Sequence, residues 1–347
     1  MPSLPSVYSI IQFPAVTLAS RSSSSHTAQI YHRGKLSKLR EETARLPGYH
    51  LDKFIQGRES HFPQGSSIVR NFSIHDCRHF SLEQEISVYI APHGKGWVGI
   101  VWLDTGRDLG QDEAGPWQAK ALQCESWEVQ FQPTVQRRPG KEPNRLLQSA
   151  AFLHINYGQH LDHETMAADS FYALTDVFRF IAFSEAQFLN LVQSALDQEL
   201  DIRLLSQQSL QKTAGLWNLV YNKQVLDRHV RRLEEILSFI EHHHKIVDWP
   251  KAVTSISREK SEKAARKLQM DYSDLVKRSC TLRTDFDNVM DILQNNAMID
   301  ESQKAISQAE GVAKLTRLAF FFVTLSLTAS IFGMNTRQLT GDARLSI

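Results

Sequence analysis

The sequence predicts an α+β protein in which an N-terminal α/β domain is followed by long antiparallel helices of the coiled-coil type and one transmembrane helix. Three observations support this order. Segments with β-strand character lie within residues 68–135, heptad patterns begin near residue 204, and an uncharged apolar segment covers residues 318–333. With 347 residues, the chain has room for two domains of roughly 150 residues each.

The composition of each segment and the spacing of its apolar residues also suggest where the parts of the chain begin and end. We predict five parts: an acid-poor disordered tail (1–45), an α/β domain (46–203), a long helical hairpin or stalk (204–314), a transmembrane helix (315–335) and a short remainder (336–347).

The composition argues against several classes of protein. The chain has 39 Lys+Arg against 38 Asp+Glu, so it lacks the charge excess typical of nucleic-acid binding, and we expect no nucleic-acid partner. Cys77, Cys124 and Cys280 are far apart and form no CxxC pair, which fits a reducing compartment. The sequence contains no P-loop, no GxSxG motif and no Ser/His/Asp arrangement. We therefore expect no enzyme, and an enzyme built on the strand region is the least favoured interpretation.

The first forty residues contain no Asp or Glu; the first acidic residue is Glu41. A serine run at Ser22–Ser25 and several basic residues give this part the composition of a mitochondrial transit peptide. Three prolines within the first 14 residues, however, would interrupt an amphipathic helix. We therefore favour a disordered tail and keep mitochondrial targeting, with the mitochondrial inner membrane as destination, as the minority alternative.

A β-hairpin is predicted in the first half of the chain. The segment Ile86–Ile90 alternates apolar and polar residues, and Trp97–Leu103 is rich in β-branched and aromatic residues. The sequence His93–Gly96 between them has the composition of a tight turn.

Helical patterns dominate from Asn144 onward. Within the apolar stretch Ser170–Leu200, Ser184 with Gln187 three residues later has the pattern of a capping box, which predicts a new helix there. A long helix is then expected from Leu204 to His244, and Trp249-Pro250 should end it. Its apolar positions alternate at spacings of four and three: Leu226, Val230, Leu233, Leu237 and Ile240.

A second long helix is predicted to begin near Ser255 and to form an antiparallel hairpin with the first. Its heptad seam consists of Leu268, Tyr272, Leu275, Ser279, Leu282, Phe286, Val289 and Leu293. No proline follows Lys251, so this helix could continue to Phe332, over a length of more than about 100 Å. A helix of that length must be shared with partner chains, with a membrane, or with both.

The apolar segment Leu318–Gly333 contains no charged residue. Extended to Leu315–Asn335 it includes only Arg317 and gives about 30 Å of helix, the thickness of a hydrocarbon core. Lys314 and Arg317 would then extend toward one interface. The alternative at this point is a buried helix in a soluble core.

Hydroxyl side chains recur inside the segment, at Thr324, Ser326, Thr328 and Ser330. Such groups can bond back to their own helix in apolar surroundings. Ser326 and Ser330 share one face with four other residues, Val312, Leu315, Ala319 and Val323. A stripe of this kind suits close helix packing or a narrow water-lined path.

Two stretches resemble a known family. Leu315–Ala319, followed by about a dozen apolar residues and then Ile331–Asn335, resembles the first transmembrane helix of CorA-type divalent-cation channels. The stretch Phe183–Asn190 is similar to the fungal CorA-like branch of that family. The resemblance covers roughly Ala150–Asn335, and the strand region agrees only in general type.

This resemblance implies a channel subunit with a cytosolic N-terminal domain, working as a homopentamer in a lipid bilayer. It would pass Mg²⁺ or a related divalent cation down its electrochemical gradient, with no cofactor. Gly333, Met334 and Asn335 would form the selectivity site at the outer mouth, where Asn335 would offer a carbonyl oxygen to hydrated Mg²⁺, Gly333 would permit close backbone approach and Met334 would pack outward. The residues that map onto the pore lining are Val312, Leu315, Ala319, Val323, Ser326 and Ser330.

Two departures from the family pattern favour a second hypothesis. Family members have a second transmembrane helix after a short acidic loop, whereas Thr336–Ile347 is polar and too short to span a membrane; it would be a truncated outer loop. Thr324 stands about where a proline is common in the family. The alternative function is therefore a truncated, nonconducting, membrane-anchored helical scaffold of the same family.

Other groups of potential metal ligands give weaker signals. His160, Asp162, His163 and Glu164 could share one helical turn, but they lack a second pair, so an ordinary surface or core cluster is favoured. The run His242–His244 suits a helix C-terminus better than a metal. Carboxylates recur along the stalk at Asp271, Asp274, Asp285, Asp287, Asp291, Asp300 and Glu301. In CorA-type proteins such carboxylates can bind regulatory Mg²⁺, but a solvated helix face explains them equally well.

Overall fold

A computed structural model of the chain describes residues 10–22, 36, 40, 67–76, 78–94, 96–106, 128–134, 148–205, 209–245 and 249–339. It divides into two compact units, Met1–Val289 and Met290–Ile347. The first combines a small antiparallel sheet with long helices, and the second continues the last helix. This architecture confirms the predicted α+β class.

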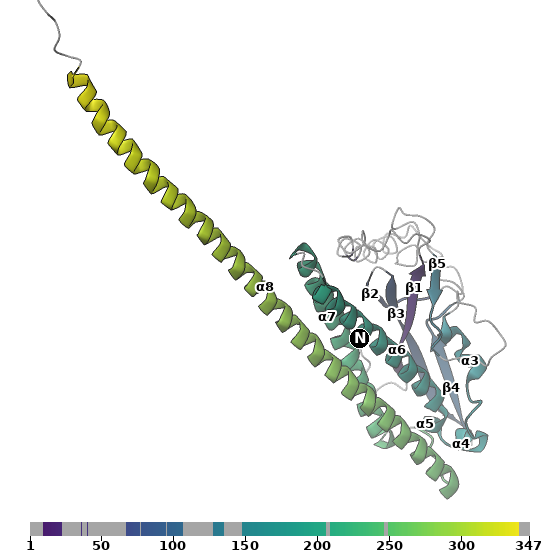
Figure 1. The fold of residues 1–347 in the computed structure, drawn as a ribbon. Coiled ribbons are helices and arrows are strands. Elements are labelled where there is room, and N and C mark those ends of the chain that lie inside the picture. Colours follow the sequence, from purple (N-terminus) through teal and green to yellow (C-terminus); the bar gives the residue numbers. More distant parts are fainter. Residues whose placement is uncertain are drawn as a thin grey trace, which may run out of the picture. The chain divides into compact units, whose positions relative to one another are not determined.

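Within the described residues, the sheet of the first unit has five strands, all in antiparallel pairs (Figure 1). Four follow the order β2-β3-β1-β5, and β4 pairs with β3. The strands are β1 (Ile10–Ser22), β2 (Asn71–Ile74), β3 (His79–His93), β4 (Gly96–Leu103) and β5 (Glu128–Phe131). β3 is the longest strand and pairs with β1, β2 and β4, so it forms the centre of the sheet.

Strand β1 corrects the prediction of a disordered tail over residues 1–45, which is wrong for Ile10–Ser22. Phe13 and Val16 are 2% and 1% exposed, so the apolar residues of this segment bury themselves in the sheet. Pro14 is tolerated because β5 pairs only with the end of β1, from Ala19 onward, and thus does not pair with β1 at the proline. Residues 10–22 therefore belong to the folded core.

The β3–β4 hairpin is confirmed. His93 pairs with Gly96 at its end, and Ile86 pairs with Leu103 where the ladder begins. Gly94 has φ +60, in the left-handed region that glycine adopts without a Cβ clash. The turn predicted at His93–Gly96 therefore lies where β3 and β4 join.

Short helices follow the sheet and three long ones complete the fold. The short elements are a 3₁₀ turn (Ser149–Phe152), α3 (Leu153–Asn156), α4 (His163–Ala168), α5 (Ser170–Ala173) and a second 3₁₀ turn (His243–Lys245). The long helices are α6 (Thr175–Leu205), α7 (Ser209–His242) and α8 (Ser255–Leu339).

The predicted helix start at Ser184 is wrong, because α6 runs through that position. Ser184 is fully buried, and its hydroxyl donates to the carbonyl of Ile181 at 2.8 Å. A serine that bonds back to its own helix satisfies itself locally and does not need to cap a new helix. The predicted break at Trp249-Pro250 is confirmed, since these residues separate α7 from α8.

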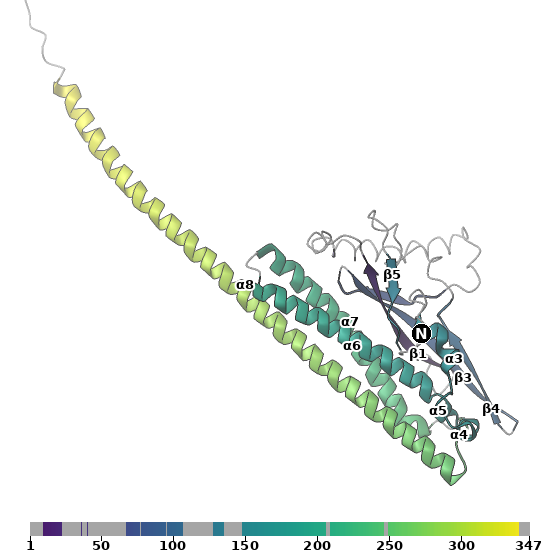
Figure 2. The ribbon, with the colours of Figure 1, turned by 45° about the vertical axis from the view of Figure 1, so that its right-hand side comes forward.

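The antiparallel helical hairpin is also confirmed by contacts at both ends. Lys223, early in α7, pairs with Asp287, late in the packed part of α8. Glu241, at the end of α7, accepts a hydrogen bond from Gln269. Figure 2 shows α6, α7 and the first part of α8 side by side. The heptad seam of α8 is buried at every predicted position from Leu268 to Val289: Leu268, Tyr272, Leu275, Ser279, Leu282, Phe286 and Val289.

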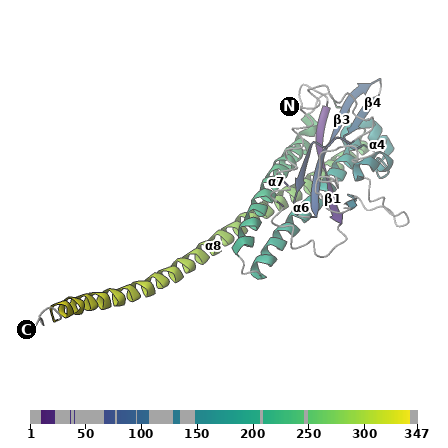
Figure 3. The same ribbon diagram turned by 90° about the horizontal axis from the view of Figure 1, so that it is seen from above.

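The core of the first unit lies between the sheet and these helices. Phe13 of β1 makes an edge contact with Phe178 of α6, with ring centroids 4.9 Å apart, and another with Phe239 of α7 at 6.1 Å. Seen from above, α6 and α7 run beside the strands (Figure 3). The Tyr272 hydroxyl of α8 donates to the carbonyl of Phe178 at 2.9 Å, which ties α8 to α6 at this core.

Candidate functional site

The apolar segment near the end of α8 is the strongest candidate site. Among the described residues, α8 is the one helix long and apolar enough to cross a membrane, and 0% of that stretch is buried within the chain. Phe320, Phe321 and Phe322 are all exposed. The described residues of the chain therefore do not bury this stretch.

The threonine hydroxyls in and just before this segment are satisfied by their own helix. The Thr324 hydroxyl donates to the carbonyls of Phe320 and Phe321 at 2.9 and 2.8 Å. The Thr328 hydroxyl donates to Thr324 and Leu325 at 3.0 and 2.8 Å. Since these bonds need no water, the threonines are compatible with a hydrocarbon environment.

The predicted pore stripe lies on one uninterrupted helix. Its six members, spaced by three or four residues, share a face and are all exposed: Val312, Leu315, Ala319, Val323, Ser326 and Ser330. The structure thus brings them together as a line along α8. Their role in lining a pore stays a prediction.

The tripeptide Gly333–Asn335 lies within α8, which ends at Leu339. A Cβ atom added at Gly333 would meet no atom of the described residues within 4 Å, so these residues impose no steric need for glycine. The side chains of Met334 and Asn335 lie outside the described part of the structure, and their roles stay predictions.

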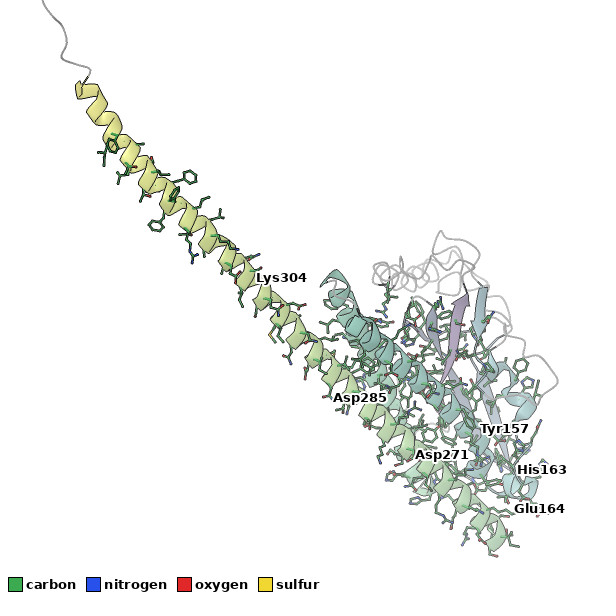
Figure 4. The ribbon with its side chains drawn as sticks, in the orientation of Figure 1. Tyr157, His163, Glu164, Asp271, Asp285 and Lys304 are labelled. Atoms are coloured by element: carbon green, nitrogen blue, oxygen red, sulfur yellow. The ribbon has the colours of Figure 1, made fainter. Side chains whose placement is uncertain are left out.

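Residues of the predicted His/Asp/Glu cluster have other partners or face solvent. Asp162 caps α4: its carboxylate accepts from the Thr165 amide at 3.1 Å and pairs with Lys260 at 3.1 Å. The hydrogen bonds from Thr165, followed by Lys260, lower the pKa of Asp162 to about 2. His163 and Glu164 lie on α4, at the surface of the first unit (Figure 4). Within the described residues, no group of three or more His, Cys, Asp or Glu is arranged to hold a metal ion.

The run His242–His244, at the end of α7 and in the 3₁₀ turn that follows, makes local contacts. His242 and His243 place Nδ1 within 2.8 and 2.6 Å of the carbonyls of Ser238 and Ile240, at the C-terminal end of the helix. His243 also stacks on Phe171 with ring centroids 3.8 Å apart, and burial lowers its pKa. These contacts explain the histidines without a metal.

The stalk carboxylates are spread along α8. Asp287 pairs with Lys223, whereas Asp271, Asp274, Asp291 and Glu301 are exposed. Figure 4 shows Asp271 and Asp285 separated along the helix. Binding of a regulatory ion by these groups would need ligands from another chain.

A buried charged cluster was not predicted from the sequence. Glu83 of β3 pairs with Arg232 of α7, and Glu185 of α6 lies against His229 of α7. Burial acts to raise the pKa of Glu83, but His229 and the neighbouring arginines outweigh it and lower this pKa. One signal was present in the sequence: Glu185 lies four residues after Ile181 and four before Leu189, at a helical phase where the other residues are apolar.

Comparisons with known proteins yielded one structural similarity. No family model matches the chain, and no curated protein matches it. The solved soluble domain of CorA from Methanocaldococcus jannaschii is similar with a TM-score of 0.31 and 14% identity, over 61% of this chain and 70% of that chain. At this TM-score the similarity carries no argument about function. It also leaves the fungal-branch resemblance a prediction.

Proposed function

We propose that this chain is a subunit of a CorA-like metal-ion channel that passes Mg²⁺ or a related divalent cation across a membrane, down its electrochemical gradient. One observation carries the proposal. The uncharged segment 318–333 is an unburied part of α8, and its last residue, Gly333, begins the tripeptide Gly333-Met334-Asn335.

A bilayer is the environment that accounts for the exposed segment. Removing apolar surface from water contributes about 25 cal/mol per Å². The large side chains of this segment leave much of their apolar surface exposed within the chain, so covering that surface would be strongly favourable. Phe320, Phe322 and Phe332 are 70%, 60% and 71% exposed within the chain. In lipid this surface would be covered, and every backbone group of the helix would keep its intrahelical partner.

The proposed selectivity site rests on the chemistry of Mg²⁺. This ion dehydrates reluctantly and keeps several water molecules, so neutral oxygens that accept from those waters suit its passage better than a tight carboxylate cage. Asn335 would supply such an oxygen from each subunit. The first unit would lie in the cytosol, as the sequence resemblance implies.

A second seam on α8 supports assembly of several copies. Ile292, Ile299 and Ile306 recur every seven residues and are 52%, 54% and 61% exposed. They lie outside the buried seam, whose last fully buried member is Val289. Copies anchored in one membrane would present these isoleucines to each other in parallel, as in a coiled coil. The number of copies, five, is the number that the resemblance implies.

Ion uptake tests the proposal. Full-length protein expressed in cells that lack their own Mg²⁺ uptake should restore it, and Asn335→Ala should reduce uptake at least tenfold. Asn296→Ala, at an exposed asparagine of α8 before the apolar segment, is the matched control and should leave uptake unchanged. Both variants should reach the membrane in equal amounts.

Two outcomes would contradict the proposal at different points. Full uptake by Asn335→Ala would remove the assigned role of that side chain. No uptake by the wild-type protein, despite correct insertion and assembly, would favour the nonconducting anchored scaffold.

A further inference from the structure

Strand β4 has an unusual composition for a strand at the margin of a sheet. Its eight residues, Gly96–Leu103, include no charged residue and no proline. Among the described residues it pairs with β3 alone, so one of its two edges has no strand partner there. Figure 2 shows the β3–β4 hairpin at the margin of the first unit. Proteins commonly protect such an edge with lysine, proline or a covering element, because its unpaired N–H and C=O groups can bind another strand.

The two tryptophans of β4 differ in their surroundings. Trp97 lies on the face toward α4, where its Nε1 donates to the carbonyl of Met166 at 3.1 Å. A Cβ atom added at Gly99 would lie 2.8 Å from the Trp97 ring, so this ring covers Gly99 on that face. Trp102 lies on the opposite face, since side chains alternate along a strand, and it is 74% exposed. Trp97 is therefore packed within the chain, whereas the described residues leave Trp102 largely uncovered.

Exposed apolar side chains of neighbouring strands lie on the same face as Trp102. Tyr89 of β3 pairs with Ile100 of β4 and with Ile10 of β1, so these three side chains form one row across the sheet. Val98 and Trp102 flank Ile100 on this face, two positions away on either side. All five side chains are exposed, and we call them the β4 patch. A contiguous apolar patch on the surface of a folded domain marks an interaction site.

We propose that the open edge of β4 pairs in antiparallel fashion with β4 of a second copy of the chain. Two copies related by a two-fold axis present the same surface to each other, and an antiparallel strand pair satisfies this symmetry. A strand without charge meets no electrostatic repulsion from its own copy, whereas a charged peptide would find no opposite charge on it. The inference is independent of the proposed transport function.

The register with Ile100 at the centre continues the β4 patch from one copy to the other. Ile100 then lies opposite the partner's Ile100, and Trp102 lies opposite the partner's Val98. Side chains directly opposite each other in an antiparallel pair have Cβ atoms about 4.5–5.5 Å apart, so these apolar groups pack together. The open N–H and C=O groups of the two edges bond to each other at the same time.

Disulfide formation between copies tests this pairing. The full-length chain, in detergent micelles and with Cys77, Cys124 and Cys280 changed to serine, carries Ile100→Cys. Mild oxidation should join most chains into dimers, because the proposed register places position 100 opposite its counterpart. Val98→Cys is the matched control. Its two copies lie four residues apart along the paired strands, about 13 Å, so they should cross-link at least tenfold less.

The absence of dimers, or equal cross-linking of Ile100→Cys and Val98→Cys, would overturn the inference. Maleimide labelling then shows what replaces it. A shielded thiol at position 100 without dimers means that another part of the same chain covers β4, and an open thiol means that the edge does not pair with its own copy. If Ile100→Cys does not fold, Val98→Cys combined with Trp102→Cys supplies the same test, because these positions lie opposite each other between the two copies.

Discussion

At the scale of single residues, the turn between β2 and β3 contains an ion pair whose strength depends on pH. His79 Nδ1 lies 2.7 Å from Asp76 Oδ2, and this hydrogen bond raises the pKa of His79. A raised pKa in the folded state means that the stabilisation is complete below the unfolded value of about 6.5 and is lost as the pH rises through the folded value. The side chains are 35% and 23% exposed, so the effect is limited to about 1 kcal/mol or less.

His79→Gln should therefore lower the free energy of unfolding at pH 5.5 and change it little at pH 8.5. Chemical unfolding of wild type and variant at the two pH values measures the difference. His163→Gln, at an exposed histidine of α4, is the control and should show no such pH-dependent loss. Equal losses for His79→Gln at both pH values would show that its ring packs without carrying charge.

The residues of the buried charged cluster, which were not predicted from the sequence, share one property: their partners are distant along the chain. His229 and Glu185 are 44 positions apart, and Arg232 and Glu83 are 149 apart. Spacing within one helix shows that Glu185 belongs to the buried face, but it cannot show which side chain on another element balances its charge. The heptad residues could be predicted because their burial follows from the periodicity of a single helix.

At the scale of elements, α8 has two apolar seams, one buried in the first unit and one exposed. Leu282 is 2% exposed in the seam that packs within the first unit. Leu282→Ala should lower the free energy of unfolding of that unit by about 2–5 kcal/mol, because it removes a buried side chain and leaves a cavity. Tryptophan fluorescence during chemical unfolding measures the change.

Ile299→Ala on the second seam provides the comparison. Ile299 is exposed and follows Val289, so its loss should change the unfolding of the first unit by no more than about 0.5 kcal/mol. Its effect should appear instead as fewer subunits per complex in detergent, by light scattering. Destabilisation of the first unit by both substitutions to the same extent would contradict the division of α8 into two seams.

Elements were predictable where local signals agreed. For the β3–β4 hairpin, a turn sequence lay between two segments of β-strand character. For α8, which starts at Ser255, a proline break preceded a heptad pattern. Strand β1 was missed because the absence of acidic residues and the three early prolines favoured a disordered tail. Its burial depends on pairing with β3, whose partner residues lie 59 to 79 positions later. Long-range strand pairing leaves little trace in the residues of one strand.

At the scale of the whole molecule, the order of sheet, helical hairpin and apolar end was evident from the composition and from the spacing of apolar residues. The sequence alone could not show whether the apolar end folds back into the chain. That question depends on tertiary contacts, and among the described residues 0% of the segment is buried. The membrane interpretation therefore depends on the structure as much as on the motif.

A charge placed in the middle of the apolar segment tests whether α8 crosses a membrane. Leu325 lies in the middle of the segment 318–333 and is 49% exposed within the chain. In a bilayer, Leu325→Lys would place a charge near the centre of the hydrocarbon, with a penalty of about 3 kcal/mol for the lysine in addition to the lost leucine. The wild-type protein should remain in the membrane pellet after an alkaline carbonate wash, and Leu325→Lys should shift toward the soluble fraction.

Ile306→Lys separates membrane insertion from a general effect of added charge. Ile306 is also exposed on α8 but precedes the apolar segment by more than ten residues, so its lysine would remain in water and the variant should stay in the pellet. Release of the wild-type protein by the wash would show that α8 does not span the bilayer. A channel subunit cannot conduct ions without crossing the membrane, so that single result would remove the basis for transport, whatever Asn335 contributes.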